Sequence, residues 1–168
     1  MPTRYEAVGP VEIPFVMNAK KSKLVQKSFG LKALEEHGIG ALRGCYVFCI
    51  SGAHGSIRPY YVGKARIDFE SEAFTADKLV KYNEVLHRVT HGRPIMLFVT
   101  PVTTKGKFNK TAVGALEQYL IGLAYQVNDD IQNVHGIPKP TFEIVGVHVP
   151  KKGNVGAPLL TFRKAFKI

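Results

Sequence analysis

The spacing of apolar positions changes along the chain, and each spacing predicts an element. Residues 44–50 and 59–64 are apolar, aromatic runs separated by the turn-rich segment SGAHGSIR, a pattern typical of a β-hairpin. Residues 95–101 form another continuous apolar run and predict a buried strand. A last β-favouring run at 142–149 predicts an edge strand or an extension of the sheet.

Helical spacing of apolar residues predicts the helices. Residues 20–37, 75–90 and 110–127 each carry such a stripe, and residues 157–166 predict a short terminal helix. Thr75 stands at the start of the second helix, where a threonine can cap the helix. The third helix is expected to bury Leu116, Tyr119, Leu120, Leu123, Ala124 and Val127.

The order of these elements, helix–β–β–α–β–α–β–α, predicts the fold class. It fits an α+β fold in which a small, mainly antiparallel sheet, made of a β-hairpin plus a central strand, is flanked by helices. We expect a basic N-terminal extension with a helix at 1–43, of which residues 1–19 are irregular. A core domain follows at 44–133, and a C-terminal strand and short helix packed on this core complete the chain at 134–168.

Composition and cysteine usage narrow the cellular setting. The 168-residue chain is 45% hydrophobic, which is typical of a globular protein with one core. No apolar run is long enough to cross a bilayer, and the segment MPTRYEAVGP lacks the apolar stretch of a signal peptide, so we expect a cytoplasmic protein. Cys45 and Cys49 on one strand would lie roughly 13 Å apart, too far for a disulfide, and we expect both to be reduced core residues.

Positive charge changes the expected partners. The formal net charge is +10 and the pI is about 9.7, and such a field attracts polyanions. A nucleic acid is favoured, while an acidic membrane surface or an acidic protein stays open on charge alone. The segment 20–37 concentrates lysines, which form either a solvated helix face or a phosphate-facing surface: Lys20, Lys21, Lys23, Lys27 and Lys32.

Two tyrosine-glycine tripeptides lie at hairpin spacing. They are Gly44-Cys45-Tyr46 and Tyr61-Val62-Gly63, and a helix, a strand and a glutamate-bearing helix follow them in that order. This arrangement resembles the GIY-YIG nuclease superfamily over about residues 44–133. The flanking sequences YVGKAR and TFRKAFKI resemble a divergent, mostly uncharacterised bacterial branch of that superfamily.

The resemblance implies a role for each matching residue. Tyr46 would accept a proton from water, Tyr61 would orient the water or a phosphate oxygen, and Glu117 would bind Mg²⁺ or Mn²⁺. Asn133, or else Asn128, would fix loop geometry or hydrogen-bond near the tyrosines. The alternative is that both tyrosines only pack a half-buried hairpin.

The chemistry of a phenol adds a requirement. A tyrosine with an ordinary pKa near 10 is a poor base at neutral pH, so we expect a nearby cation to lower the pKa of Tyr46. The candidates for this cation are Lys64, Arg66, Lys78 and Lys81, and Lys64, Arg66 and Lys81 are also expected to contact nucleic acid.

One position departs from the family pattern. Family members carry an arginine in the helix after the second tripeptide, about one turn before a tyrosine or histidine. Here Lys78 and Tyr82 have the i, i+4 spacing that places them on one helix face, and we expect them to bind the scissile phosphate. A lysine cannot make the bidentate fork of an arginine. Arg66 is an alternative clamp, and Arg88 is a further candidate contact to nucleic acid.

The resemblance implies a metal-dependent endonuclease, and the positive charge favours DNA as its substrate, with RNA possible and no membrane partner. A single active site cuts one strand at a time, so duplex cleavage calls for a homodimer or two sequential events. The alternative is a catalytically impaired, nucleic-acid-binding module with the same fold. A third possibility is a protein-interaction role for the basic N-terminal helix.

Overall fold

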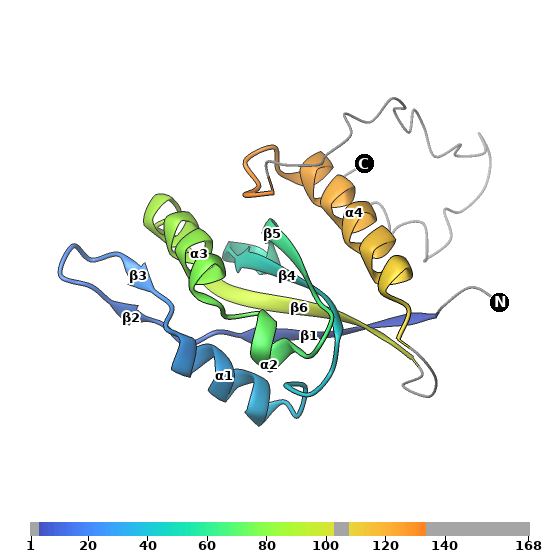
Figure 1. Ribbon diagram of the computed structural model, residues 1–168. Coiled ribbons are helices and arrows are strands. Elements are labelled where there is room, and N and C mark those ends of the chain that lie inside the picture. Colours follow the sequence, from blue (N-terminus) through green and yellow to red (C-terminus); the bar gives the residue numbers. More distant parts are fainter. Residues whose placement is uncertain (1–3, 103–107, 134–168) are drawn as a thin grey trace, which may run out of the picture.

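A four-stranded antiparallel sheet in the order β1-β6-β4-β5 is the centre of an α+β fold, which confirms the predicted class (Figure 1). The computed structural model describes residues 4–102 and 108–133. The strands are β1 (Tyr5–Glu12), β2 (Val16–Met17), β3 (Lys23–Leu24), β4 (Gly44–Ser51), β5 (Ile57–Ala65) and β6 (Arg93–Pro101). The helices are α1 (Lys27–Glu36), α2 (Phe69–Glu72), α3 (Ala76–Arg88) and α4 (Lys110–Val127), with a 3-10 turn at Ala53–Gly55.

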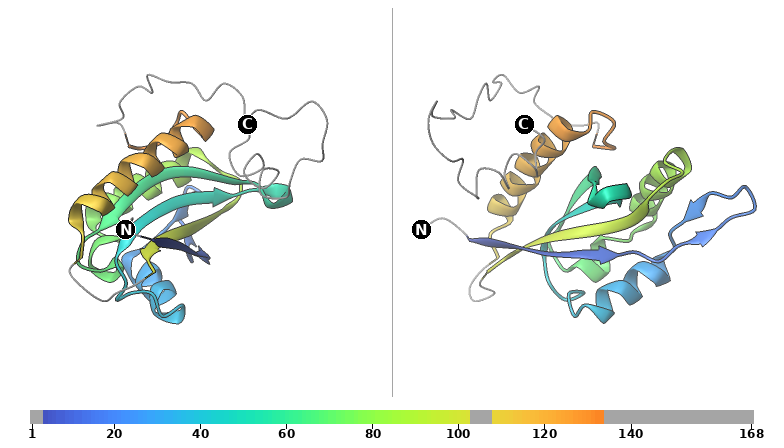
Figure 2. Two further views of the ribbon diagram at one scale, coloured as in Figure 1. Left: turned by 90° about the vertical axis from the view of Figure 1, so that its right-hand side faces the viewer. Right: turned by 180° about the vertical axis from the view of Figure 1, so that it is seen from behind.

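Each face of the sheet packs on its own apolar core. Helices α1, α2 and α3 cover one face, where the rings of Tyr46 and Phe98 both contact the ring of Phe69. Helix α4 covers the other face, where Val62 packs with Ile121. Figure 2 shows α1 and α4 on opposite sides of the sheet. A site that uses residues from both layers must therefore lie at an edge of the sheet.

The predicted hairpin is confirmed as β4 and β5, which pair along their length. Strand β4 also pairs with β6, so it is buried along its length, whereas β5 is an edge strand. Successive side chains of a strand point to opposite faces. Tyr61 therefore faces the core of α1 to α3, and Lys64 faces α4. Cys45 and Cys49 are buried free thiols on β4, as predicted.

Residues 1–19 were expected to be irregular, and this prediction is wrong. Residues Tyr5–Glu12 form the edge strand β1, which pairs with β6. The register shifts between Val8 and Val11, and Pro10 lies in this bulge. A bulge on an edge strand is a position where a proline costs no ladder hydrogen bond. The partner strand lies far away in sequence, so local pattern gave no sign of the pairing.

The helix predicted at 20–37 begins only at Lys27. Residues before it form the β2–β3 hairpin, which stands apart from the main sheet. Asn83 of α3 fixes the end of this hairpin, because its amide both accepts from the Val25 N–H and donates to the Val25 carbonyl. Gly30 inside α1 makes room for Phe74, since a Cβ there would lie 2.6 Å from the ring Cγ. Helix α2 was not predicted.

The other two helices match their predicted ranges closely. Thr75 occupies the N-cap position of α3, but its hydroxyl donates to the side chain of Asp77 instead of capping the helix. Helix α4 has the predicted bounds, and its buried face matches the prediction in part. Val113, Ile121 and Ala124 are buried, whereas Tyr119 is 61% exposed.

Several predictions concern residues outside the described part of the chain. These are the strand at 142–149, the terminal helix at 157–166 and the packing of 134–168 on the core. Among residues 4–102 and 108–133, no helix has the length and apolar character needed to cross a membrane.

Candidate active site

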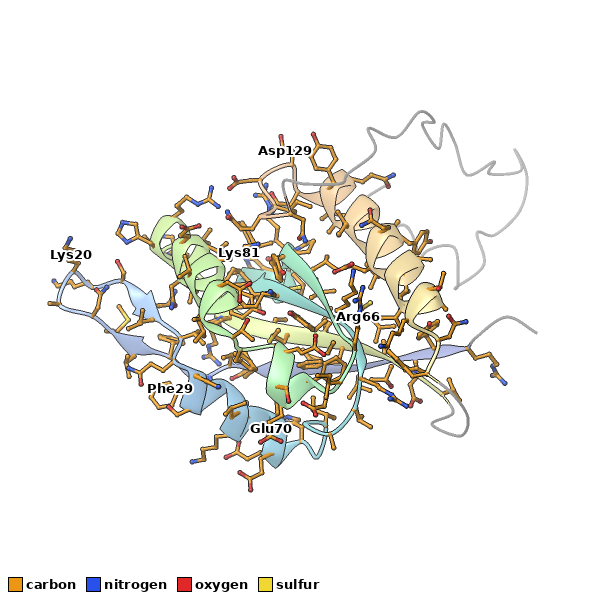
Figure 3. All side chains as sticks on the ribbon, viewed as in Figure 1. Lys20, Phe29, Arg66, Glu70, Lys81 and Asp129 are labelled. Atoms are coloured by element: carbon orange, nitrogen blue, oxygen red, sulfur yellow. The ribbon has the colours of Figure 1, made fainter. Side chains whose placement is uncertain are left out.

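A cluster of polar side chains gathers along β5, between α3 and α4. We call it the β5 cluster, and its members are Tyr61, Lys64, Lys78, Lys81 and Glu117. Lys81 extends from α3 (Figure 3). Its Nζ lies 5.0 Å from the centre of the Tyr61 ring. The charges of Lys78 and Glu117 both act on the Tyr61 phenol. Three separate elements thus bring opposite charges to one border of the sheet.

Tyr61 is the tyrosine of the two tripeptides that faces cations. Its side chain is buried, and this burial raises the pKa of Tyr61 above its ordinary value. The positive charge of Lys78 opposes that rise. The cation expected beside a tyrosine is therefore present, but at the second tripeptide.

Tyr46 lies deeper than expected. Its residue exposure is 0%, and its hydroxyl donates a 3.3 Å hydrogen bond to the Glu72 carbonyl. Burial first, and the neighbouring Tyr61 second, raise the pKa of Tyr46 well above its usual range. The expectation that a nearby cation lowers the pKa of Tyr46 is wrong, because α2 places a backbone carbonyl at its hydroxyl.

Tyr82 is a core residue. Its ring stacks on Phe48 at a centroid distance of 4.4 Å, and its hydroxyl donates to the Ala73 carbonyl at 2.8 Å. Burial raises the pKa of Tyr82 well above its ordinary value. The expectation that Tyr82 binds a phosphate is wrong, because its ring is buried and its hydroxyl is bonded to a backbone carbonyl.

Lys78 lies on the same face of α3 as Tyr82, at the point where this face reaches solvent. Its side chain is 23% exposed, and its Nζ also pairs with Asp77. The hydrogen bond from Lys78 lowers the pKa of Asp77 to about 2. Burial lowers the pKa of Lys78, but the hydrogen bond to Asp77 and the charge of Tyr61 outweigh burial, so the net shift is upward. Lys78 therefore carries its charge throughout the physiological range.

Glu117 forms an ion pair with Lys64 across the gap between α4 and β5. The two side chains are only 13% and 28% exposed, and the contact uses one carboxylate oxygen, Oε2. Cys45 lies below this pair on β4, and burial raises its pKa to about 12, so the thiol stays protonated. Sequence reasoning named both members of the pair but gave no sign that they meet.

The β5 cluster offers a metal ion one carboxylate, that of Glu117. Among the residues that the structure describes, no group of three or more His, Cys, Asp or Glu side chains is placed to hold an ion. Mg²⁺ keeps several waters and binds through one or two carboxylates plus substrate phosphates. Glu117 fits that donor set, although Lys64 already engages one of its oxygens.

Two asparagines fasten the segment after α4 to the β5 edge. Asn133 accepts from the Val62 N–H and donates to the Val62 carbonyl, both at 2.7 Å. Asn128 donates to the Pro59 carbonyl and accepts from Arg58. These bonds occupy an otherwise free strand edge next to Tyr61. Both amides therefore hold loop geometry, and neither makes a described hydrogen bond to a tyrosine hydroxyl.

The remaining basic candidates are dispersed. Arg88 pairs with Asp130 at 2.7 Å, and Lys23 donates to the Thr90 carbonyl. Arg66 is exposed after β5, and Lys20 lies far from it at the tip of the β2–β3 hairpin (Figure 3). Lys21 is exposed at the same tip, and Lys27 is exposed in the first turn of α1. The lysines of segment 20–37 thus do not join the β5 cluster.

Comparison with known proteins gave no match. No family model, no curated protein and no solved structure matched this chain. The geometry of the β5 cluster and the charge of the chain are therefore the observations that point to a function.

Proposed function

We propose that this protein is a metal-dependent endonuclease that hydrolyses phosphodiester bonds in DNA at the β5 cluster. The observation that carries the proposal is the meeting of a phenol, lysines and one carboxylate, all partly or wholly buried, at one sheet edge. Burying charge is costly, and half-buried groups of perturbed pKa concentrate at functional sites. A basic chain supplies the field that attracts the polyanion.

Each member of the cluster has a role that suits its surroundings. Tyr61, in its phenolate form, accepts a proton from the attacking water, since it is the tyrosine with cations beside it. Lys78 binds the scissile phosphate as a point charge, with Lys81 close by. Tyr46 is a positioning residue, because its hydroxyl is bonded to a carbonyl and its ring supports β5.

Glu117 is the residue that would hold Mg²⁺ or Mn²⁺. When bound, such an ion stabilises the negative charge that develops on the phosphate and the leaving oxygen. Because Lys64 engages Oε2 of Glu117, we expect Lys64 and a divalent cation to compete for this carboxylate. Lys64 released from Glu117 is then free to contact a phosphate oxygen.

The deciding experiment compares the wild type with Glu117→Ala on plasmid, single-stranded and branched DNA in Mg²⁺ or Mn²⁺. We expect the substitution to abolish cleavage. Glu35→Ala, a change of an exposed α1 carboxylate, is the matched control and should cleave normally. Cleavage that persists at the wild-type rate in Glu117→Ala would exclude this site.

A specific observation favours a second candidate, a nucleic-acid-binding module that does not cut. The Tyr46 and Tyr82 hydroxyls both donate to backbone carbonyls, and Lys64 already neutralises Glu117. A lysine also stands where the family has an arginine. This candidate predicts tight DNA binding that weakens steeply with salt, with no cleavage by wild type or Glu117→Ala.

A further inference from the structure

The β2–β3 hairpin projects from the body of the fold beside α3 (Figure 1). Lys20 and Lys21 are exposed at its tip, and neither takes part in an ion pair among the described residues. By contrast, exposed Lys32 pairs with Glu36. We propose that this hairpin is a fixed arm whose tip lysines contact the phosphate backbone of duplex DNA, at a distance from the β5 cluster. The inference rests on the proposed function and names a duplex as the substrate.

The tip of the arm has a defined shape. The Asn18 side chain accepts from the backbone N–H groups of Lys20 and Ser22 at 3.0 and 2.9 Å. The Asn18 backbone N–H donates to the Ser22 carbonyl at 2.9 Å, which closes the turn. Lys21 has a φ of +58°, a left-handed conformation that a non-glycine residue adopts only where the turn requires it. The two ammonium groups are therefore presented by a structured turn.

Hydrogen bonds attach the arm to α3. The Ser22 hydroxyl lies 3.2 Å from Nδ1 of His87, and Lys23 Nζ donates to the Thr90 carbonyl at 2.7 Å. The Asn83 amide holds Val25 through two bonds of 2.8 and 3.1 Å. These contacts span the second half of α3 and the residues just after it. The arm is consequently fixed relative to the helix that carries Lys78.

Helix α3 then sets the spacing between the two contacts. Lys78 lies in its first turn, and His87, which touches the arm, comes nine residues later. At about 1.5 Å per residue, this separates the two points by roughly 13 Å along the helix axis. Duplex DNA rises about 3.4 Å per base pair, so a duplex lying along α3 would meet the arm about four base pairs from the scissile phosphate.

The apolar surface of the arm also suits a groove. Val16 and Met17 on β2 are 38% and 57% exposed. Two-stranded ribbons can enter a DNA groove, and proteins that bind the minor groove insert apolar side chains between base steps. A single strand lacks the second backbone and the groove, so the arm should favour duplex over single-stranded DNA.

The test measures binding of the full chain to a 30-base-pair duplex without divalent cations, by fluorescence anisotropy across salt. Lys20→Gln with Lys21→Asn removes both charges, and asparagine tolerates the positive φ at position 21. Each lost phosphate contact lowers the salt slope by about 0.9, so we expect a slope smaller by about 1 to 2 and binding about tenfold weaker at low salt. Affinity and salt slope for the duplex should fall by these amounts, and those for a single strand of the same length should fall much less.

Two variants control for charge and for folding. Lys20→Arg with Lys21→Arg keeps both charges and should bind as the wild type does. Lys32→Gln with Arg93→Gln removes two exposed charges that already pair with carboxylates, and should leave the slope unchanged. Circular dichroism verifies that each variant is folded.

Failure of the arm proposal and failure of the proposed nuclease function give different results. If folded Lys20→Gln/Lys21→Asn binds duplex with wild-type affinity and slope, or if the wild type binds no duplex, the arm proposal is overturned. If the wild type never cleaves DNA but the charge-removing variant shows the reduced slope, the arm stands and the nuclease function fails.

Discussion

The ring of Tyr46 lies against the Cα of Gly63, its cross-strand partner in the β4–β5 hairpin. A Cβ at position 63 would lie 2.5 Å from the Tyr46 hydroxyl oxygen, closer than real contacts allow. The two tripeptides GCY and YVG are therefore joined physically: the glycine of the second makes room for the tyrosine of the first. This packing holds β5 in the position from which Tyr61 and Lys64 reach the cluster.

Gly63→Ala tests that packing. The added methyl collides with a fully buried ring, and overpacking of this kind costs about 1 to 3 kcal/mol of unfolding free energy. Urea denaturation followed by circular dichroism measures the loss. Gly114→Ala is the control, because nothing lies within 4 Å of a Cβ there and alanine favours a helix interior. If both variants were equally stable, the ring of Tyr46 would not be confined by Gly63.

The pH dependence of cleavage tests the assignment of Tyr61. Only the phenolate accepts a proton, and the pKa of Tyr61 is raised above 10, so its active form is a small and growing fraction as pH rises toward 10. We expect the logarithm of the single-turnover rate to rise by about one per pH unit from 7 to 9.5. Tyr61→Phe should abolish that slope.

Tyr46→Phe is the matched comparison for Tyr61→Phe. It removes only the hydrogen bond to the Glu72 carbonyl, which costs about 1 kcal/mol of stability, and should keep the pH slope. A slope lost in Tyr46→Phe and retained in Tyr61→Phe would return the proton-accepting role to Tyr46.

Lys64 and a divalent cation are expected to compete for Glu117, so removal of the Lys64 ammonium group should raise the affinity for metal. Lys64→Met removes the ammonium group from Oε2, so Mn²⁺ should bind several-fold more tightly, as measured by electron paramagnetic resonance of free Mn²⁺. Glu117→Gln should abolish this binding. Lys32→Met, which breaks the exposed pair with Glu36, is the control and should leave the affinity unchanged. Equal affinities in Lys64→Met and the wild type would separate Lys64 from the metal site.

Lys78→Arg tests the proposal that Lys78 binds the scissile phosphate. A guanidinium group at this position can make the bidentate contact to phosphate that an ammonium cannot, so we expect faster single-turnover cleavage. Lys78→Met should reduce the rate on the order of 100-fold, as expected when a group that stabilises transition-state charge is lost. The near-UV circular dichroism spectrum reports whether the aromatic core beside Tyr82 is intact. Wild-type rates in folded Lys78→Met would remove Lys78 from the site.

Elements whose pattern lies within one segment were predicted correctly, whereas elements that depend on contacts with a distant segment were not. The β4–β5 hairpin, β6 and α4 follow from runs and periods that a single segment contains. Strand β1 depends on pairing with β6, which comes some ninety residues later, so its own pattern was too weak. The same holds for β2 and β3, whose position is fixed by Asn83 of α3.

The candidate site shows the same division. The i, i+4 spacing of Lys78 and Tyr82 correctly placed both on one helix face. Spacing cannot tell which part of such a face meets solvent or core. Here Tyr82 stacks on Phe48 in the core, while Lys78 on the same face is 23% exposed. Likewise, nothing local indicates that α2 delivers a carbonyl to the Tyr46 hydroxyl.

By itself the sequence determined the fold class, the hairpin with its two tripeptides, the bounds of α4 and the positive charge, because local apolar patterning and composition fix these. Only the tertiary structure decided that Tyr61 faces the cations while Tyr46 packs against Gly63, and that Lys64 meets Glu117. The physical reason is that β5 is an edge strand: its two faces belong to different layers, and the groups that flank it arrive from helices far apart in the chain.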